Sequence, residues 1–101
     1  MRRIVIAPSF DAEFFEISLS IERAFGARIA DKFDARFQHI ATTLAHAPLI
    51  GSAGHGYPTG LYGFVMSPSW VFYRFNDDEI VFLHIRDGRM NTDEQLFLDD
   101  V

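Results

Sequence analysis

The chain has 101 residues, of which 49% are hydrophobic, so it is long enough for one domain with an ordered core and too apolar for an intrinsically disordered protein. Its formal net charge of −5 argues against general binding to DNA or RNA through phosphates. It has no cysteine and no apolar run of transmembrane length, which excludes disulfides, thiolate chemistry and a membrane span. We therefore expect a single domain over residues 1–101 that works in the cytoplasm.

The first half of the chain predicts one strand and two helices. Residues 2–7 are typical of a short strand. Residues 10–25 carry apolar side chains at helical spacing, with Ser9 placed as the N-cap and Gly26 as the stop signal. The same spacing recurs over residues 27–46. Because only a short link separates the two helices, we expect them to be antiparallel neighbours.

The second half predicts three strands. A glycine-rich loop at residues 51–60 has no phosphate-loop signature, and a strand is expected at residues 61–66. Residues 70–75 and 79–86 are rich in β-branched and aromatic side chains and flank the polar residues 76–78, which predicts a β-hairpin. The order β-α-α-β-β-β indicates a two-layer α+β fold in which the helices cover one face of an antiparallel meander.

The β-hairpin is apolar on both faces, although a sheet with one face in water should alternate. A three-residue loop places Arg74 opposite Ile80 and Phe72 opposite Phe82, whereas a two-residue loop splits the polar groups between the faces. We expect the first register because it leaves one face almost free of charge for the helices: Val71, Tyr73, Phe75, Val81, Leu83 and Ile85. The open face then holds Trp70, Phe72, Arg74, Ile80, Phe82, His84 and Arg86.

Large aromatic side chains beside arginines are typical of the centre of a protein interface. Trp70, Phe72 and Phe82 each bury about 150–250 Å² when covered, so together they match the largest exposed patch of an ordinary monomer. We therefore expect the open face to bind a partner, through Trp70, Phe72, Arg74, Phe82, His84, Arg86 and Arg89. One alternative is that the chain's own segment 96–98 folds back over this face, and another is that two copies pair through it as a homodimer.

No motif supports a metal, a cofactor or an enzyme's nucleophile. The four histidines, which are His39, His46, His55 and His84, lack the spacing of a metal site. No serine has an evident base, and no Gly-x-Ser-x-Gly occurs. We therefore predict no catalytic residue, no cofactor and no metal.

Several short motifs, taken in order, resemble the ParE/RelE superfamily of bacterial toxins from type II toxin–antitoxin pairs. The resemblance rests on the order of the elements and on Pro48-Leu49-Ile50-Gly51, Leu61-Tyr62-Gly63-Phe64, the strand 70–75 and the last strand with its end, Ile80 to Arg89. The resemblance covers nearly the whole chain. It implies a small toxin held inactive by a cognate antitoxin, whose C-terminal segment often covers the open face of the sheet.

The superfamily has two main activities, which are inhibition of DNA gyrase by ParE-like members and cleavage of ribosome-bound messenger RNA by RelE-like members. For RNA cleavage the resemblance implies an arginine where this chain has Trp70, and a tyrosine or histidine near the C-terminus, which the residues after Arg89 lack. The resemblance therefore favours a divergent, non-enzymatic ParE-like toxin of a plasmid stabilisation system, without direct DNA binding. The alternative endonuclease would use Arg74, Arg86 and Arg89 on the phosphate and His84 for proton transfer.

Overall fold

The computed structural model describes residues 1–52 and 58–87, and the statements below concern these residues. They form a strand, two helices, a short 3₁₀ helix and three further strands. Their bounds are β1 Arg3–Ile6, α1 Pro8–Phe25, α2 Ala27–His46, η1 Pro48–Ile50, β2 Tyr62–Met66, β3 Ser69–Phe75 and β4 Glu79–Asp87. The predicted α+β order β-α-α-β-β-β is confirmed, and the second helix has the predicted bounds.

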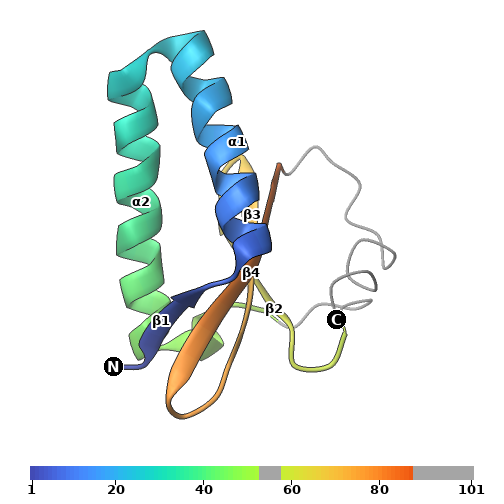
Figure 1. The fold of residues 1–101 in the computed structure, drawn as a ribbon. Coiled ribbons are helices and arrows are strands. Elements are labelled where there is room, and N and C mark those ends of the chain that lie inside the picture. The colour runs from blue at the N-terminus through green and yellow to red at the C-terminus, as the bar shows by residue number, and fades with distance from the viewer. Residues whose placement is uncertain (53–57, 88–101) are drawn as a thin grey trace.

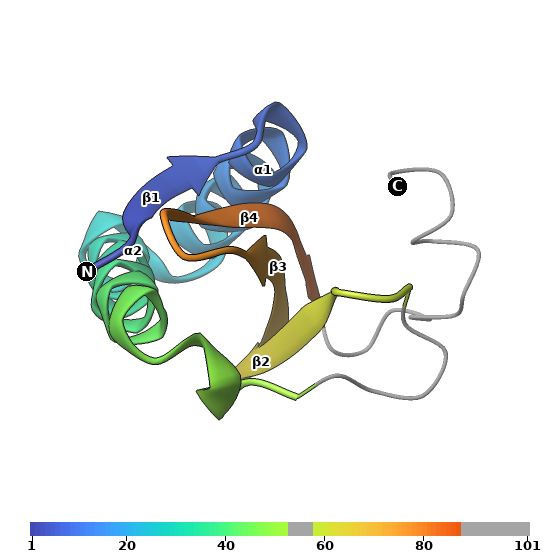
Figure 2. The ribbon, with the colours of Figure 1, turned by 90° about the horizontal axis from the view of Figure 1, so that it is seen from below.

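The strands form one mixed sheet in the order β1-β4-β3-β2, which Figure 2 shows from below. Strands β2, β3 and β4 make the expected antiparallel meander, and β1 adds to its edge in parallel with β4. The helices lie side by side against the sheet and extend past its end (Figure 1). Neither helix is long and apolar enough to cross a membrane, as far as the described residues show.

Helix α1 begins earlier than the sequence pattern indicates. Its N-cap is Ala7 and Pro8 takes the first turn, where the missing N–H of proline costs nothing. The expectation that Ser9 is the N-cap is wrong, because its hydroxyl instead donates to the Leu83 carbonyl at 2.7 Å. The stop at Gly26 is confirmed, and its φ of 95° is a backbone conformation that favours glycine.

The core lies between the helices and the sheet and is dominated by aromatic side chains. Phe10 and Phe37 join the two helices with ring centroids 4.9 Å apart, and Phe37 meets Phe82 of the sheet edge-on at 5.2 Å. Tyr73 is fully buried, and its hydroxyl donates to the Pro48 carbonyl. The tyrosine therefore links the centre of the sheet to η1, which follows α2.

The predicted register of the β3–β4 hairpin is wrong at its turn. The Asn76 N–H donates to the Glu79 carbonyl at 2.9 Å, so the loop consists of Asp77 and Asp78 alone. The Asn76 side chain accepts hydrogen bonds from the N–H groups of Asp78 and Glu79, which stabilises this tight turn. A side-chain to backbone bond of this kind favours the two-residue loop over the expected three-residue one.

The tighter turn reverses the faces of β4. Tyr73 is now paired with Phe82, and Ile80 and Phe82 are buried in the core beneath the helices. A bulge follows, because Phe72 pairs with His84 and leaves Leu83 as an extra residue. The bulge shifts the alternation, so that Ile85 also faces the core. The expected inward positions of Val81 and Leu83 are therefore wrong, while those of Val71, Tyr73, Phe75 and Ile85 are confirmed.

Candidate functional site

The open face of the sheet, turned away from the helices, carries less exposed aromatic surface than expected. Phe72 has no exposed surface and packs with Leu61, against which Trp70 and Leu83 also pack. The Trp70 and Phe72 rings are stacked with centroids 6.4 Å apart, and Trp70 is half-buried. The predicted place of Phe82 on this face is wrong, because it lies in the core.

What remains accessible on the open face is small and mixed. Arg74 is exposed, and Val65, which pairs with Trp70 across the strands, is 47% exposed. Arg89 and the segment 96–98 lie outside the described residues, so their predicted contacts are not placed. Of the predicted partner-binding residues, Arg74 is therefore the exposed one in the described part of the chain, and Trp70 is half-buried.

His84 and Arg86 lie together, but both are anchored by a residue that sequence reasoning missed. The Glu13 carboxylate of α1 lies 3.0 Å from His84 Nδ1 and 3.0 Å from Arg86 Nη1, and it accepts the Ile85 N–H at 3.2 Å. His84 is 3% exposed. The side chains of His84 and Arg86 are thus held by Glu13 where α1 packs against β4.

This polar cluster exists because β1 is shorter than β4. Pairing with β1 ends at Phe82 and Ala7, so beyond this point no strand among residues 1–52 and 58–87 pairs with that edge of β4. Helix α1 supplies Ser9 and Glu13, four residues apart on one side of the helix, to bond the Leu83 carbonyl and the Ile85 N–H. The spacing is visible in the sequence, but nothing there shows that α1 runs along this edge.

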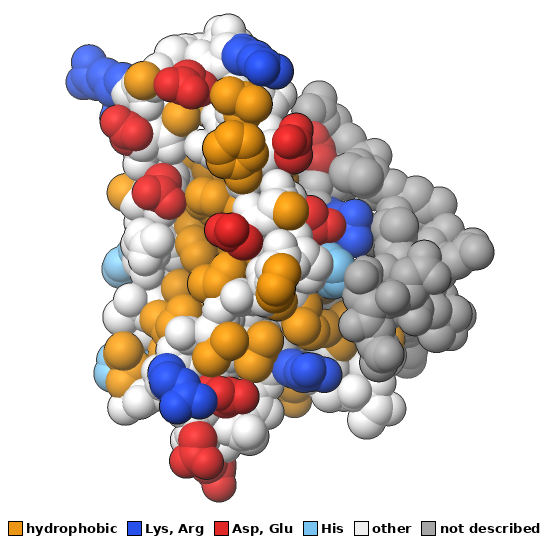
Figure 3. All heavy atoms as spheres, viewed as in Figure 1, with side chains coloured by type: hydrophobic (Ala, Val, Ile, Leu, Met, Phe, Trp, Pro, Cys, Tyr) orange, Lys and Arg blue, Asp and Glu red, His pale blue; other side chains and the backbone are white. Residues whose placement is uncertain are grey.

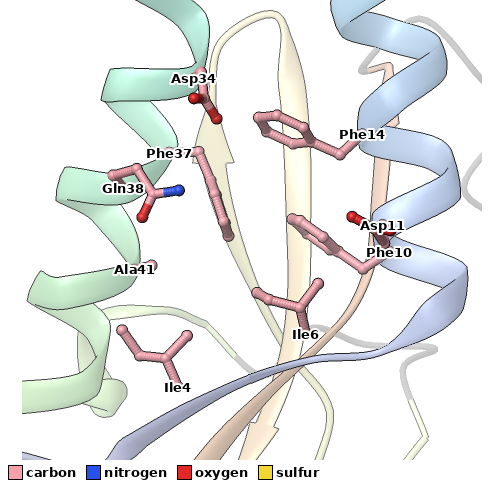
Figure 4. A pocket seen from close by; sticks show the side chains of 9 residues that line it. All are labelled: Ile4, Ile6, Phe10, Asp11, Phe14, Asp34, Phe37, Gln38 and Ala41. Carbon is pink, nitrogen blue, oxygen red and sulfur yellow. The ribbon is translucent and has the colours of Figure 1, made fainter.

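A concave feature lies between the two helices, beside β1, and we call it the interhelical cleft (Figure 4). It has a volume of about 180 Å³. Its lining residues are Ile4, Ile6, Phe10, Asp11, Phe14, Asp34, Phe37, Gln38 and Ala41. In Figure 3 hydrophobic side chains run between the helices, and acidic side chains lie beside them.

The interhelical cleft has an apolar base and an acidic rim. Phe10, Phe37 and Ala41 are buried at its base, and Figure 4 shows the phenyl rings pointing into the space between the helices. Asp11 on α1 and Asp34 on α2 are exposed on opposite sides, and neither carboxylate forms an ion pair with a cation in residues 1–52 or 58–87. The apolar stripes of the helices predict the core, but not that they leave this opening.

Within the described residues, no three histidine or carboxylate side chains are grouped so as to hold a metal ion. The open face and the cleft both consist of apolar side chains with a few charges at their margins.

Comparison with known proteins gives three consistent matches. Residues 4–92 match the family model described as the ParE toxin of the type II toxin–antitoxin system, parDE. The curated protein Toxin ParE3 from Caulobacter vibrioides is 34% identical over 71 residues, which cover 70% of this chain and 71% of that protein. A solved structure described as the chromosomal ParDE TA system from P. aeruginosa has the same fold, with a TM-score of 0.73 at 17% identity over 86% of this chain and 96% of that one.

Proposed function

Because this chain belongs to the ParE toxin family of type II toxin–antitoxin systems, we propose that it acts by binding a protein, through inhibition of DNA gyrase, and that a cognate antitoxin neutralises it. The match of the family model over residues 4–92 is the observation that carries the proposal. On this proposal the toxin works in the bacterial cytoplasm, and its plasmid or chromosome is maintained because cells that lose the antitoxin stop growing.

The geometry of the open face supports protein binding over RNA cleavage. Cleavage at a 2′-hydroxyl needs a base, an acid and cations that can reach the phosphate. Among the described residues of this face, His84 is almost fully buried beside Glu13, and Arg86 is ion-paired with the same carboxylate. Arg74 is left as the exposed cation there, which suits one contact of a protein interface better than a cleavage centre.

The test is induced expression of the chain with and without the antitoxin encoded beside it, followed by supercoiling and translation assays. We expect growth arrest that the antitoxin relieves, and loss of gyrase supercoiling with the purified toxin. Cleavage of ribosome-bound messenger RNA with normal supercoiling would show the endonuclease instead. A stable dimer without any effect on growth would show the non-toxic interaction module.

A charge reversal on the open face sharpens this test. We expect Arg74→Glu to reduce the potency of gyrase inhibition by about tenfold, because charges at an interface rim mainly set the association rate. Arg28→Glu is the matched control, since Arg28 is an exposed arginine on α2, away from the sheet. If both variants inhibit gyrase equally well, the open face does not contribute to the toxic action.

A further inference from the structure

We propose that the acidic C-terminal segment of this chain, residues 92–101, docks on one flank of α2 in the same molecule. We call this surface the basic flank, and its residues are Lys32, Ala35, Arg36, His39 and Ile40. The segment lies outside the described residues, so its place is inferred from its sequence and from the surface that it meets. The inference goes beyond the proposed function, because it concerns neither the open face of the sheet nor the interhelical cleft.

The basic flank is hollowed and lies on the side of α2 away from the interhelical cleft. With about 3.6 residues per turn, Lys32 and Arg36 point away from Asp34, which borders the cleft. The hollow on the flank has a volume of about 640 Å³ and includes the side chains of Ala35 and Ile40. Because roughly 150 Å³ is enough to hold benzene, this hollow has room for several apolar side chains.

The positive charges on this side of α2 are not balanced by carboxylates of the described chain. Arg28, Lys32 and Arg36 follow one another at four-residue spacing and are all exposed. Like charges at this spacing repel each other and destabilise a helix. No ion pair within residues 1–52 and 58–87 involves a side chain of α2. A chain with a net charge of −5 thus keeps a line of positive charge on one helix, and this line attracts an acidic segment.

Residues 92–101 have the chemistry that complements the basic flank. The apolar run Leu96-Phe97-Leu98 stands between two pairs of acidic residues, and the segment contains no lysine or arginine. The acidic residues are Asp93, Glu94, Asp99 and Asp100. The apolar run is suited to cover the hollow at Ala35 and Ile40, while the carboxylates on either side meet the cations of α2.

The end of β4 brings the segment close to the basic flank. Asp87, the last described residue, pairs with Ser69 of β3. Ser67, just before β3, accepts a hydrogen bond from Arg36 Nη1 at 3.0 Å through its carbonyl. Paired strands are only about 5 Å apart, whereas an extended chain from Asp87 to Leu96 spans up to about 30 Å. The segment is therefore long enough to reach α2 from this end of the sheet.

The other hollows near the end of the described chain have the wrong charge for this segment. The hollow between α1 and the end of β4 has a volume of about 310 Å³ and is lined by Glu13, Glu16 and Asp87. The arginine in its lining is ion-paired with Glu13. The interhelical cleft also has an acidic rim. Carboxylates repel an acidic segment at both places, so charge favours the basic flank.

The experiment uses pairs of introduced cysteines, because the full-length chain contains none. A disulfide needs two Cα atoms within about 7 Å, so the rate of its formation reports which surface the segment contacts. We expect Gln95→Cys with Ala35→Cys to form an intramolecular disulfide at least about tenfold faster than either control pair. The controls combine Gln95→Cys with Ala12→Cys at the hollow beside α1, or with Val65→Cys on the open face. Intact mass after thiol alkylation gives the rates, and circular dichroism checks that each variant is folded.

A charge exchange tests what holds the segment in place. In the Gln95→Cys and Ala35→Cys background, Lys32→Glu should slow disulfide formation at least about fivefold, and more at low salt than at high salt. The combined change Asp99→Lys and Asp100→Lys should restore the rate in the Lys32→Glu protein. Arg23→Glu is the matched control, since it makes the same charge change at an exposed position on α1 and should alter the rate less than about twofold.

Each outcome decides for or against the basic flank. Fastest disulfide formation at Ala35→Cys, slowed by Lys32→Glu and restored by the lysines at the end of the segment, supports it. Fastest formation at Ala12→Cys or Val65→Cys places the segment over α1 or the open face and overturns the proposal, as do equal rates at all three positions. Disulfide-linked dimers that increase with protein concentration also overturn it, because they assign the flank to the segment of a second copy. None of these measurements depends on gyrase or on an antitoxin.

Discussion

The carboxylate of Glu13 accepts a hydrogen bond from the main-chain N–H of Ile85, 3.2 Å away, on the part of β4 that β1 does not reach. A helix side chain thus takes the place of a neighbouring strand. Because the same carboxylate also contacts His84 and Arg86, one residue of α1 organises the whole end of β4.

Removal of Glu13 should therefore lower stability. Glu13→Ala takes away the acceptor of the Ile85 N–H and is expected to cost about 1–3 kcal/mol in urea unfolding. Glu13→Gln keeps an oxygen acceptor but loses the charge, so its cost should be smaller. Glu22→Ala, on the exposed side of the same helix, should stay within about 0.5 kcal/mol. A cost of Glu13→Ala equal to that control would contradict the role of this contact.

Gly51 has no room for a side chain. A Cβ atom built on it would overlap the Tyr73 hydroxyl, which is held by the Pro48 carbonyl. Gly51→Ala should therefore destabilise the protein by about 1–3 kcal/mol, as overpacking of a core does. Thermal unfolding measures the change, with the neighbouring exposed Ser52→Ala as the control. An unchanged midpoint for Gly51→Ala would mean that Tyr73 moves aside without cost.

The stability of the protein should fall in alkali because of Tyr73. Burial raises the pKa of Tyr73 to about 12 from 10.0. The folded state therefore holds this proton above pH 10 while the unfolded chain releases it, so stability is complete below pH 10 and decreases as the pH rises toward 12. The expected slope is about 1.4 kcal/mol per pH unit in that window.

Denaturant unfolding at several alkaline pH values measures this slope. Tyr73→Phe should remove the contribution, and it should also remove the late step in the tyrosinate absorbance. Tyr62→Phe is the control, because Tyr62 lies beside Tyr73 with stacked rings 5.8 Å apart and is only partly buried. If Tyr62→Phe abolishes the slope and Tyr73→Phe does not, the assignment is wrong.

Phe82 should behave as a core residue in mutagenesis. Phe82→Ala is expected to cost about 3–5 kcal/mol of stability, because the ring is fully buried between Phe10, Phe37 and Tyr73. Phe15→Ala, which changes a phenylalanine that is 62% exposed, should cost less than about 1 kcal/mol. Chemical unfolding of the two variants gives the comparison, and similar values would place Phe82 outside the core.

The helices and the order of the elements could be predicted because their apolar side chains repeat with a clear period. The bounds of α2 followed from that period together with Gly26 before the helix and Pro48 after it. The parallel pairing of β1 with β4 could not be predicted, since it joins residues more than seventy positions apart and leaves no mark in either segment.

The hairpin shows why the candidate site was harder to predict. With a two-residue loop and regular alternation, polar side chains would lie on both faces of the hairpin. The three-residue loop was therefore expected, because it leaves one face almost free of charge. The bulge at Leu83 removes that conflict, because it shifts the alternation partway along β4 and keeps Ile85 in the core. Phe72 therefore turned out to be buried, and a variant such as Phe72→Asp would test folding rather than the pairing of two open faces.

The place of β1 in the sheet also bears on how the chain is made. Arg3 to Ile6 pair with Glu79 to Phe82, so the first strand to leave the ribosome has no partner until most of the chain has been translated. The helical hairpin forms from local contacts, but the sheet closes last. The sheet therefore cannot be completed before Phe82 has been synthesised.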